Sequence, residues 1–171
     1  HAQNRLVDWK NPAKLITLHG SATCTKADGF FGSNAAWSYA NTHFEENVDG
    51  VNYQHNSSSI GFLVKAVGTK GSENMLGGGY DGTVLTDINT DTTPRIRARI
   101  KAGGYIDYNG SFPTSNVLIV GQREATNLSK VYVDGSMVAS GAETAATPGG
   151  LIYLGGLSFG GTCFPRDVEA W

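Results

Sequence analysis

Alternating basic residues between positions 95 and 101 are the part of this sequence best suited to chemistry. Ile96, Ala98 and Ile100 share one face of a predicted strand, and the opposite face carries the basic residues Arg95, Arg97, Arg99 and Lys101. Guanidinium groups in such a row can grip the sulfates, uronates or phosphates of an acidic glycan through bidentate hydrogen bonds. The same row also fits a solvent-facing or edge strand that is protected by charge against aggregation, so both interpretations stay open.

Aromatic and acidic residues follow the basic row. A turn at Gly103-Gly104 leads into a predicted partner strand with Tyr105, Asp107 and Tyr108. Tyrosine rings stack on sugar rings, and a carboxylate accepts hydrogen bonds from sugar hydroxyls. A glycine-rich turn, GGGYDG, is expected nearby with its own tyrosine and aspartate. The sequence therefore predicts a carbohydrate site made of Arg97, Arg99, Tyr105, Asp107, Tyr108, Tyr80 and Asp81.

Oxygen ligands recur at alternate positions in Asp87, Asn89 and Asp91, as they do at the start of a calcium loop. Thr92 stands where the turn glycine of an EF-hand would be, and Ala98 where its closing glutamate would be, so this is not an EF-hand. A hydrogen-bonded turn rich in Asp and Asn is the alternative. We expect no cofactor, with calcium at these three residues as the open alternative.

The sequence contains no recognisable catalytic motif. Glycoside hydrolysis needs two carboxylates that flank the scissile bond. Glu45 and Glu46 with Asp49 come nearest, but they lie in a predicted turn beside Gly50, where neither burial nor strand geometry tunes a pKa. There is no nucleophile elbow, and the four histidines show no metal-ligand spacing. We therefore expect a protein that is not an enzyme.

Short strands must position these residues. The segment 116–124 places Val117 and Ile119 on one face and Leu118 and Val120 on the other, which predicts a strand covered on both sides. Asp134-Gly135 predicts a tight hairpin turn between strands over 130–134 and 136–139. Further strands are predicted over residues 15–19, 36–40, 59–67, 95–101 and 151–154. Turn signals every ~8–12 residues are typical of an all-β sandwich.

Length and composition favour one globular domain over residues 1–171, with residues 1–14 as an N-terminal arm. The net charge of −2 gives no electrostatic reason to bind nucleic acid. No stretch approaches the ~18–20 apolar residues of a membrane helix, so no membrane insertion is expected. The spacing of Cys24 and Cys163 leaves open a disulfide between them or two free thiols.

Several segments resemble a known family. LIVGQR, KVYVDGSMVAS and LIYLGG, between residues 118 and 156, and FEENVDGVNYQHNSSSIGFLVKAV upstream resemble the laminin-G-like branch of the concanavalin A-like lectin/glucanase superfamily. The likeness is to variants in phage virion proteins and bacterial surface proteins. It implies an all-β, concanavalin A-like jelly-roll sandwich of two antiparallel sheets. Glucanases of this fold carry a Glu-x-Asp-x-x-Glu pattern on one strand, and this sequence lacks it.

These observations predict a non-catalytic carbohydrate-recognition or adhesion module, for acidic glycans, in a larger surface or virion protein. Its location would be extracellular or on the virion surface. One alternative is a structural virion or decoration domain that acts through oligomerisation, and another is a polysaccharide-cleaving enzyme of the same fold. The expected partners are a carbohydrate, protein neighbours in a larger assembly and further copies of the chain.

Overall fold

The computed structural model describes residues 15–25, 29–32, 39–49, 56–64, 74–80, 85–91, 95–102, 104–110, 116–144, 151–159, 162–165 and 168–169. The backbone alone is described for residues 25, 29–32, 46–47, 74–76, 80, 85–91, 101–102, 156–159, 162–165 and 168–169. The predicted arm over residues 1–14 and the predicted site residue Asp81 lie outside the described ranges. Within those ranges, no helix is long and apolar enough to cross a membrane.

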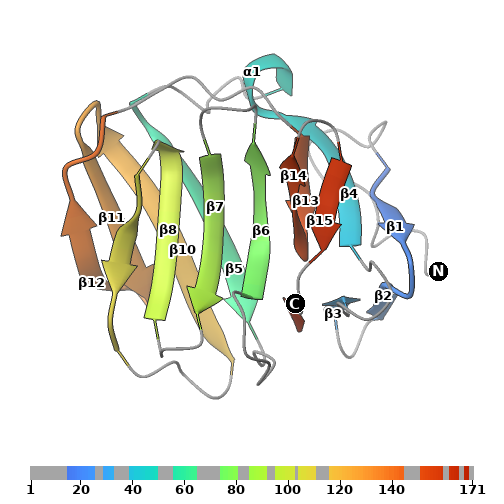
Figure 1. Ribbon diagram of the computed structural model, residues 1–171. Helices are drawn as coiled ribbons and strands as arrows, with labels where there is room; N and C mark the ends of the chain where they lie inside the picture. The colour runs from blue at the N-terminus through green and yellow to red at the C-terminus, as the bar shows by residue number, and fades with distance from the viewer. Residues whose placement is uncertain are drawn as a thin grey trace.

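Two antiparallel sheets account for most of the described chain (Figure 1). The larger sheet has seven strands, in the spatial order β1 (Thr17–His19), β4 (Tyr39–Glu45), β13 (Leu151–Leu154), β6 (Asn74–Tyr80), β7 (Leu85–Asp91), β8 (Arg95–Ala102) and β9 (Ile106–Tyr108). The smaller sheet has four, in the order β12 (Ser136–Gly141), β11 (Leu128–Val133), β10 (Val117–Ala125) and β5 (Ser58–Val64). The predicted all-β sandwich is confirmed.

Shorter elements complete the described chain. One helical turn, α1, covers Glu46–Asp49. A hairpin pairs β14 (Gly156–Phe159) with β15 (Thr162–Pro165), and a small sheet has the order β16 (Val168–Glu169), β3 (Gly29–Gly32) and β2 (Thr23–Thr25). Figure 1 shows the β14–β15 hairpin near β13, on the side of the large sheet away from β8.

The core lies between the two large sheets, where alternate residues of facing strands meet. Ile96, Ala98 and Ile100 of β8 are each at most 1% exposed, which is the inward face predicted for this strand. They face a layer from the smaller sheet that includes Phe62, Val64, Val117, Ile119 and Val131. Fully burying a side chain of this size stabilises the fold by about 1.5–3 kcal/mol, so this two-sided layer fixes which face of each strand points outward.

One predicted face of β10 differs from the structure. Val117 and Ile119 are buried, whereas Leu118 is 42% exposed, so the prediction of a strand covered on both faces is wrong. The reason is that β10 belongs to an antiparallel sheet with a single partner layer, and antiparallel sheets commonly leave their other face to solvent. Inward alternation continues through Gly121, where a Cβ would lie 2.6 Å from Cδ1 of Ile100.

The β11–β12 hairpin forms as the sequence predicts. Asp134 and Gly135 have φ angles of 48° and 80°, which Asp-Gly pairs tolerate in tight two-residue turns. The backbone N–H of Asp134 donates to the carbonyl of Leu118 at 2.9 Å. In return, Oδ1 of Asp134 accepts a hydrogen bond from the N–H of Leu118, also at 2.9 Å, which ties the turn to β10.

The run of glycines at positions 77–79 lies inside β6, so the predicted turn at GGGYDG is wrong for these residues. All three are buried. A Cβ on Gly77 would lie 2.7 Å from both the Phe62 ring and the carbonyl oxygen of Tyr153. Glycine is needed here because neighbouring strands and a core ring approach the backbone too closely for a side chain.

Candidate functional site

The predicted basic row lies on β8, between β7 and β9, and faces away from the core. Because β8 has a partner on each side, the alternative of a charge-protected edge strand does not hold for this strand. On the β7 side, the register partners of the three arginines at 95, 97 and 99 are Asp91, Asn89 and Asp87. Basic and acidic positions therefore alternate across these strands, and the row is not a purely basic strip.

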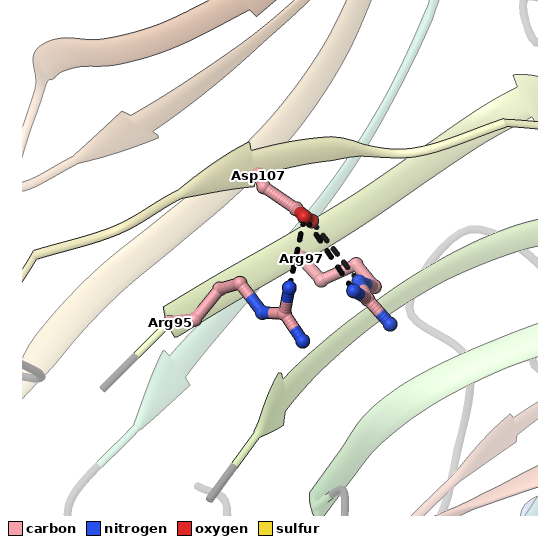
Figure 2. Close-up of polar contacts among 3 residues, drawn as sticks. All are labelled: Arg95, Arg97 and Asp107. Carbon is pink, nitrogen blue, oxygen red and sulfur yellow. Dashed lines mark hydrogen bonds and ion pairs between the residues drawn. The ribbon is translucent and has the colours of Figure 1, made fainter. Parts of the chain in front are cut away.

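Asp107 of β9 receives two of these arginines (Figure 2). It is the register partner of Arg97, and residues directly opposite in an antiparallel pair lie on the same face. Nε and Nη2 of Arg97 donate to Oδ1 and Oδ2 at 3.0 and 3.4 Å. Nη1 of Arg95 donates to Oδ2 at 3.2 Å. One carboxylate thus holds two neighbouring guanidinium groups in fixed positions.

Tyr105, the residue before β9, completes the arrangement. Its ring is contacted by two cations, with Cζ of Arg97 at 4.1 Å and Cζ of Arg99 at 4.8 Å from the ring centroid. Tyr105 nonetheless remains 48% exposed. The structure therefore brings together four predicted site residues and one further arginine of the row, and we call them the arginine–tyrosine cluster: Arg95, Arg97, Arg99, Tyr105 and Asp107.

The interactions within this cluster are weak contributors to stability. The side chains of Arg95, Arg97 and Asp107 are 22%, 13% and 30% exposed, and solvent-accessible ion pairs are worth about 0–1 kcal/mol. A cation–π contact at an exposed site adds about 0.5–1 kcal/mol. Their larger effect is to restrict long side chains in advance, which lowers the entropy cost of binding a ligand.

Other residues predicted for the site lie elsewhere or outside the described part. Tyr108 packs against the core cluster, because strand alternation turns it to the opposite face from Asp107. Its ring also lies against Gly110. Tyr80 ends β6, and only its backbone is described. We therefore leave Tyr108 out of the arginine–tyrosine cluster.

The calcium alternative does not fit the backbone. Asp87, Asn89 and Asp91 lie in β7, so both the loop and the turn predicted there are wrong. Alternate residues of an extended strand are roughly 6–7 Å apart along the chain, whereas a calcium loop curls so that its ligands converge on the ion. Among the side chains that the structure describes, no three His, Cys, Asp or Glu residues gather as metal ligands.

The acidic segment forms a local hydrogen bond within the fold. Oδ2 of Asp49 accepts a hydrogen bond from the backbone N–H of Glu45 at 2.7 Å, across the helical turn α1. Its carboxylate is thus part of the turn. Cys24 is partly buried and carries a free thiol in the structure, and only the backbone of Cys163 is described.

A cleft of about 500 Å³ opens beside the arginine–tyrosine cluster. It is lined by residues 104–107 on the β9 side and 140–144 at the end of β12, and we call it the edge cleft. In the described part of the chain, β9 and β12 are the terminal strands of their sheets, so the edge cleft lies along one edge of the sandwich. Tyr105 and Asp107 belong to both the cleft and the cluster.

Arg123 supports the edge cleft from inside the sandwich. It is 0% exposed, and its Nε donates to the carbonyl of Ile100 at 2.6 Å. Nη1 donates to three carbonyl oxygens, those of Ala125, Thr126 and Glu143, at 3.3, 3.1 and 3.0 Å. Burial lowers the pKa of the guanidinium, and the Glu143 carboxylate opposes that shift. Arg123 thereby fixes the backbone of a residue that lines the cleft.

Sequence reasoning missed both Arg123 and the cleft. A signal was present, because Arg123 follows Val117, Ile119 and Gly121 on the inward face of β10. A charge at an inward position needs a compensating partner, which points to a buried carboxylate. Residues 140–144 carry no such signal, because the packing of two sheet edges places them beside β9.

Comparisons with known proteins find fold relatives alone. No protein-family model matches the sequence, and a search of curated proteins gives no match. Solved structures do match. Domain 4 of AbnA, a GH43 extracellular arabinanase from Geobacillus stearothermophilus, in complex with arabinotriose, has a TM-score of 0.65 at 16% identity. The match covers 99% of this chain and 84% of that domain.

Two further structures illustrate the range. The receptor-binding domain of the botulinum neurotoxin C/D mosaic serotype has a TM-score of 0.64 at 11% identity over 91% of this chain, which spans only 40% of that structure. The CBM40 of Ruminococcus gnavus IT-sialidase has a TM-score of 0.53 at 12% identity, with coverage of 76% and 82%. These neighbours are concanavalin A-like and laminin-G-like jelly-roll domains, and this chain shares their fold.

Proposed function

We propose that this domain is a non-catalytic carbohydrate-recognition module of a larger surface or virion protein and acts outside the cell. The observation that carries the proposal is the half-exposed Tyr105 ring, which two guanidinium groups contact beside Asp107. Aromatic faces pack against the apolar face of a sugar ring, and fixed charged groups hydrogen-bond its hydroxyls. The arginine–tyrosine cluster offers both on one surface.

Binding would use donors and an acceptor that are already aligned. A guanidinium group presents N–H donors in a planar fork that matches carboxylate and sulfate geometry. Arg97 and Arg99 would donate to a sugar hydroxyl, or to the carboxylate or sulfate of an acidic glycan, beside Tyr105. That the ligand is acidic is a more specific proposal than carbohydrate binding itself. Acidic residues on β7 are register partners of arginines at 95 and 99, so the row does not present positive charge alone.

The fold neighbours support a carbohydrate ligand without identifying it. The arabinanase domain was solved in complex with arabinotriose, and one botulinum neurotoxin neighbour is described as dependent on two ganglioside molecules for cell entry. Those ligands belong to those proteins, which are at most 16% identical to this chain. They make a sugar-binding role the first one to test.

The test is an array of neutral and acidic glycans probed with the wild-type domain and with an Arg97→Ala/Arg99→Ala variant. We expect wild-type binding that falls at least about tenfold in the variant, which corresponds to a loss of about 1.4 kcal/mol. Lys130→Ala, on the other sheet, is the control that removes a cation without touching the cluster. Equal glycan binding by all three proteins would show that Arg97 and Arg99 do not belong to the binding site. Release of reducing sugar from a polysaccharide panel would contradict the non-catalytic role.

A second candidate function, assembly with neighbouring protein subunits, is favoured by the outer face of the smaller sheet. Leu63, Leu118 and Met137 are 52%, 42% and 56% exposed there, and Leu63 and Leu118 are register partners. Exposed apolar side chains that adjoin one another are typical of interaction surfaces. Light scattering over a concentration series tests this role. A wild-type dimer that Leu118→Lys converts to a monomer would support it, and a wild-type monomer at every concentration would reject self-assembly.

A further inference from the structure

Each arginine of the arginine–tyrosine cluster has an aspartate directly opposite it on a neighbouring strand. The register pairs are Arg95 with Asp91, Arg97 with Asp107 and Arg99 with Asp87. Residues directly opposite in an antiparallel pair belong to the same face of the sheet. Arginines and aspartates therefore occupy this face in equal number. Even with Lys101 as the fourth cation of the row, the face is close to balanced in formal charge.

The Asp107 carboxylate shows how this balance is reached (Figure 2). Its Oδ2 accepts a hydrogen bond from Nη1 of Arg95 at 3.2 Å, and its Oδ1 accepts one from Nε of Arg97 at 3.0 Å. All three side chains are partly buried, so water and salt screen their charges less than they screen fully exposed ones. One carboxylate thus offsets positive charge that a ligand would otherwise meet on two arginines.

Such a surface favours a ligand of low charge. An anionic group would compete with Asp107 for Arg95 and Arg97, and it would lie beside a carboxylate of like charge. That repulsion grows with each anionic group on the ligand, whereas sugar hydroxyls and the apolar face that packs on Tyr105 add no charge. The net charge of −2 on the whole chain gives no long-range attraction for a polyanion that would offset the repulsion.

We propose that the arginine–tyrosine cluster selects glycans of low charge density, which bring at most one anionic group to the site, and that Asp107 determines this specificity. The inference rests on the proposed function and names the ligand class of the same site. Asp107 acts through Arg95 and Arg97, so it is a positioning residue. Densely sulfated polysaccharides, which a purely basic row would bind tightly, would bind this face weakly.

The test removes the charge of Asp107 and keeps its shape. Asp107→Asn retains the size of the side chain and one acceptor oxygen, and Asp107→Glu retains the charge. Glu124→Gln is the matched control, because it neutralises a carboxylate that pairs with Lys130 on the other sheet. Wild type and the three variants are compared for binding to dextran sulfate and to the array of neutral and acidic glycans, with melting temperatures as the check on folding.

We expect wild type to bind array glycans with one anionic group or none. Its affinity for them should change less than about threefold when sodium chloride rises from about 0.05 to about 0.5 M. Asp107→Asn should bind dextran sulfate at least about tenfold more tightly than wild type at the lower salt concentration, and salt should remove this gain. Asp107→Glu and Glu124→Gln should bind dextran sulfate as wild type does. A merely structural role of Asp107 would not produce a gain in affinity that salt removes.

The outcomes separate the specificity from the function. Wild type that binds dextran sulfate more tightly than every glycan with one charge or none, and loses this binding in Arg97→Ala/Arg99→Ala, would overturn the inference and leave carbohydrate recognition standing. Equal dextran sulfate binding by Asp107→Asn and Glu124→Gln would overturn the role of Asp107. The selection by wild type is measured without any variant, so it tests the inference even if Asp107→Asn fails to fold. No binding by wild type to any glycan would reject the proposed function, and the inference with it.

Discussion

Arg123 and Arg97 are two arginines on facing sheets that use the same chemical group in opposite ways. Arg123 is fully buried, and it donates to four backbone carbonyl oxygens that the fold itself positions. The Arg97 side chain is 13% exposed, and the partners described here are an ionised side chain and a half-exposed ring. The first guanidinium serves the fold, and the second is placed where a ligand can share it.

The difference shows how burial decides the role of a charge. A buried cation needs partners for its charge. Removing it leaves the groups that it bonded buried without a donor, and this lowers the free energy of unfolding. A cation at the surface is compensated largely by water, so its removal changes stability little. The same substitution at the two positions should therefore separate folding from binding.

The largest effect is expected for Arg123→Met, which keeps an apolar side chain and removes the charge. We expect the free energy of unfolding to fall by about 3–5 kcal/mol, because four carbonyl oxygens lose their donor and the Glu143 carboxylate loses the opposite charge of Arg123. Urea denaturation measures the loss. The matched variant Arg97→Met should lose no more than about 1–2 kcal/mol, the sum of one partly buried ion pair, whose Asp107 keeps Arg95 as a partner, and one cation–π contact. Similar losses for both would break the comparison.

An intermediate effect, on binding alone, is expected for Tyr105→Ala. The ring is half exposed, so its removal should change the free energy of unfolding by less than about 1 kcal/mol. Glycan affinity should fall at least about tenfold, because an aromatic anchor at the centre of a site carries a large share of the binding energy. Tyr105→Phe keeps the ring and should retain most of the affinity. A large loss of stability with intact binding would assign Tyr105 to the fold.

The smallest effect is expected for Glu124→Gln, on the outer face of β10 next to Arg123. A hydrogen bond from Lys130 lowers the pKa of Glu124, so the carboxylate stabilises the fold above its unfolded pKa. That stability is lost as the pH falls through the lowered pKa. The melting temperature of wild type should exceed that of Glu124→Gln slightly at pH 7, and the two should converge in acid. A gap that widens in acid would contradict this sign.

The sequence predicts the sandwich well where one face of a strand is strictly apolar. The alternation of Ile96, Ala98 and Ile100 locates β8, and Asp134-Gly135 locates the hairpin, because both signals are local. The glycine run at positions 77–79 misleads, because its cause lies in Phe62 and Tyr153, which only the tertiary fold brings near.

The site shows the same limit. Strand alternation and register place Asp107 with the arginines, and that part is predictable from the β8–β9 hairpin. The same alternation sends Tyr108 to the core, which a list of aromatic residues does not reveal. The edge cleft needs residues 140–144 beside residues 104–107, and the contact between two sheet edges leaves no pattern in either segment.

Carbohydrate recognition at the arginine–tyrosine cluster is tested most directly by amide NMR of the isotope-labelled domain. The spectra would be recorded during titration with a panel of neutral and acidic oligosaccharides. We predict that at least one sugar shifts the amide signals of residues 97–99 and 105–107, with little change at Leu63 and Leu118 on the other sheet. Unchanged spectra across the whole panel, or shifts confined to the outer face of the smaller sheet, would contradict it.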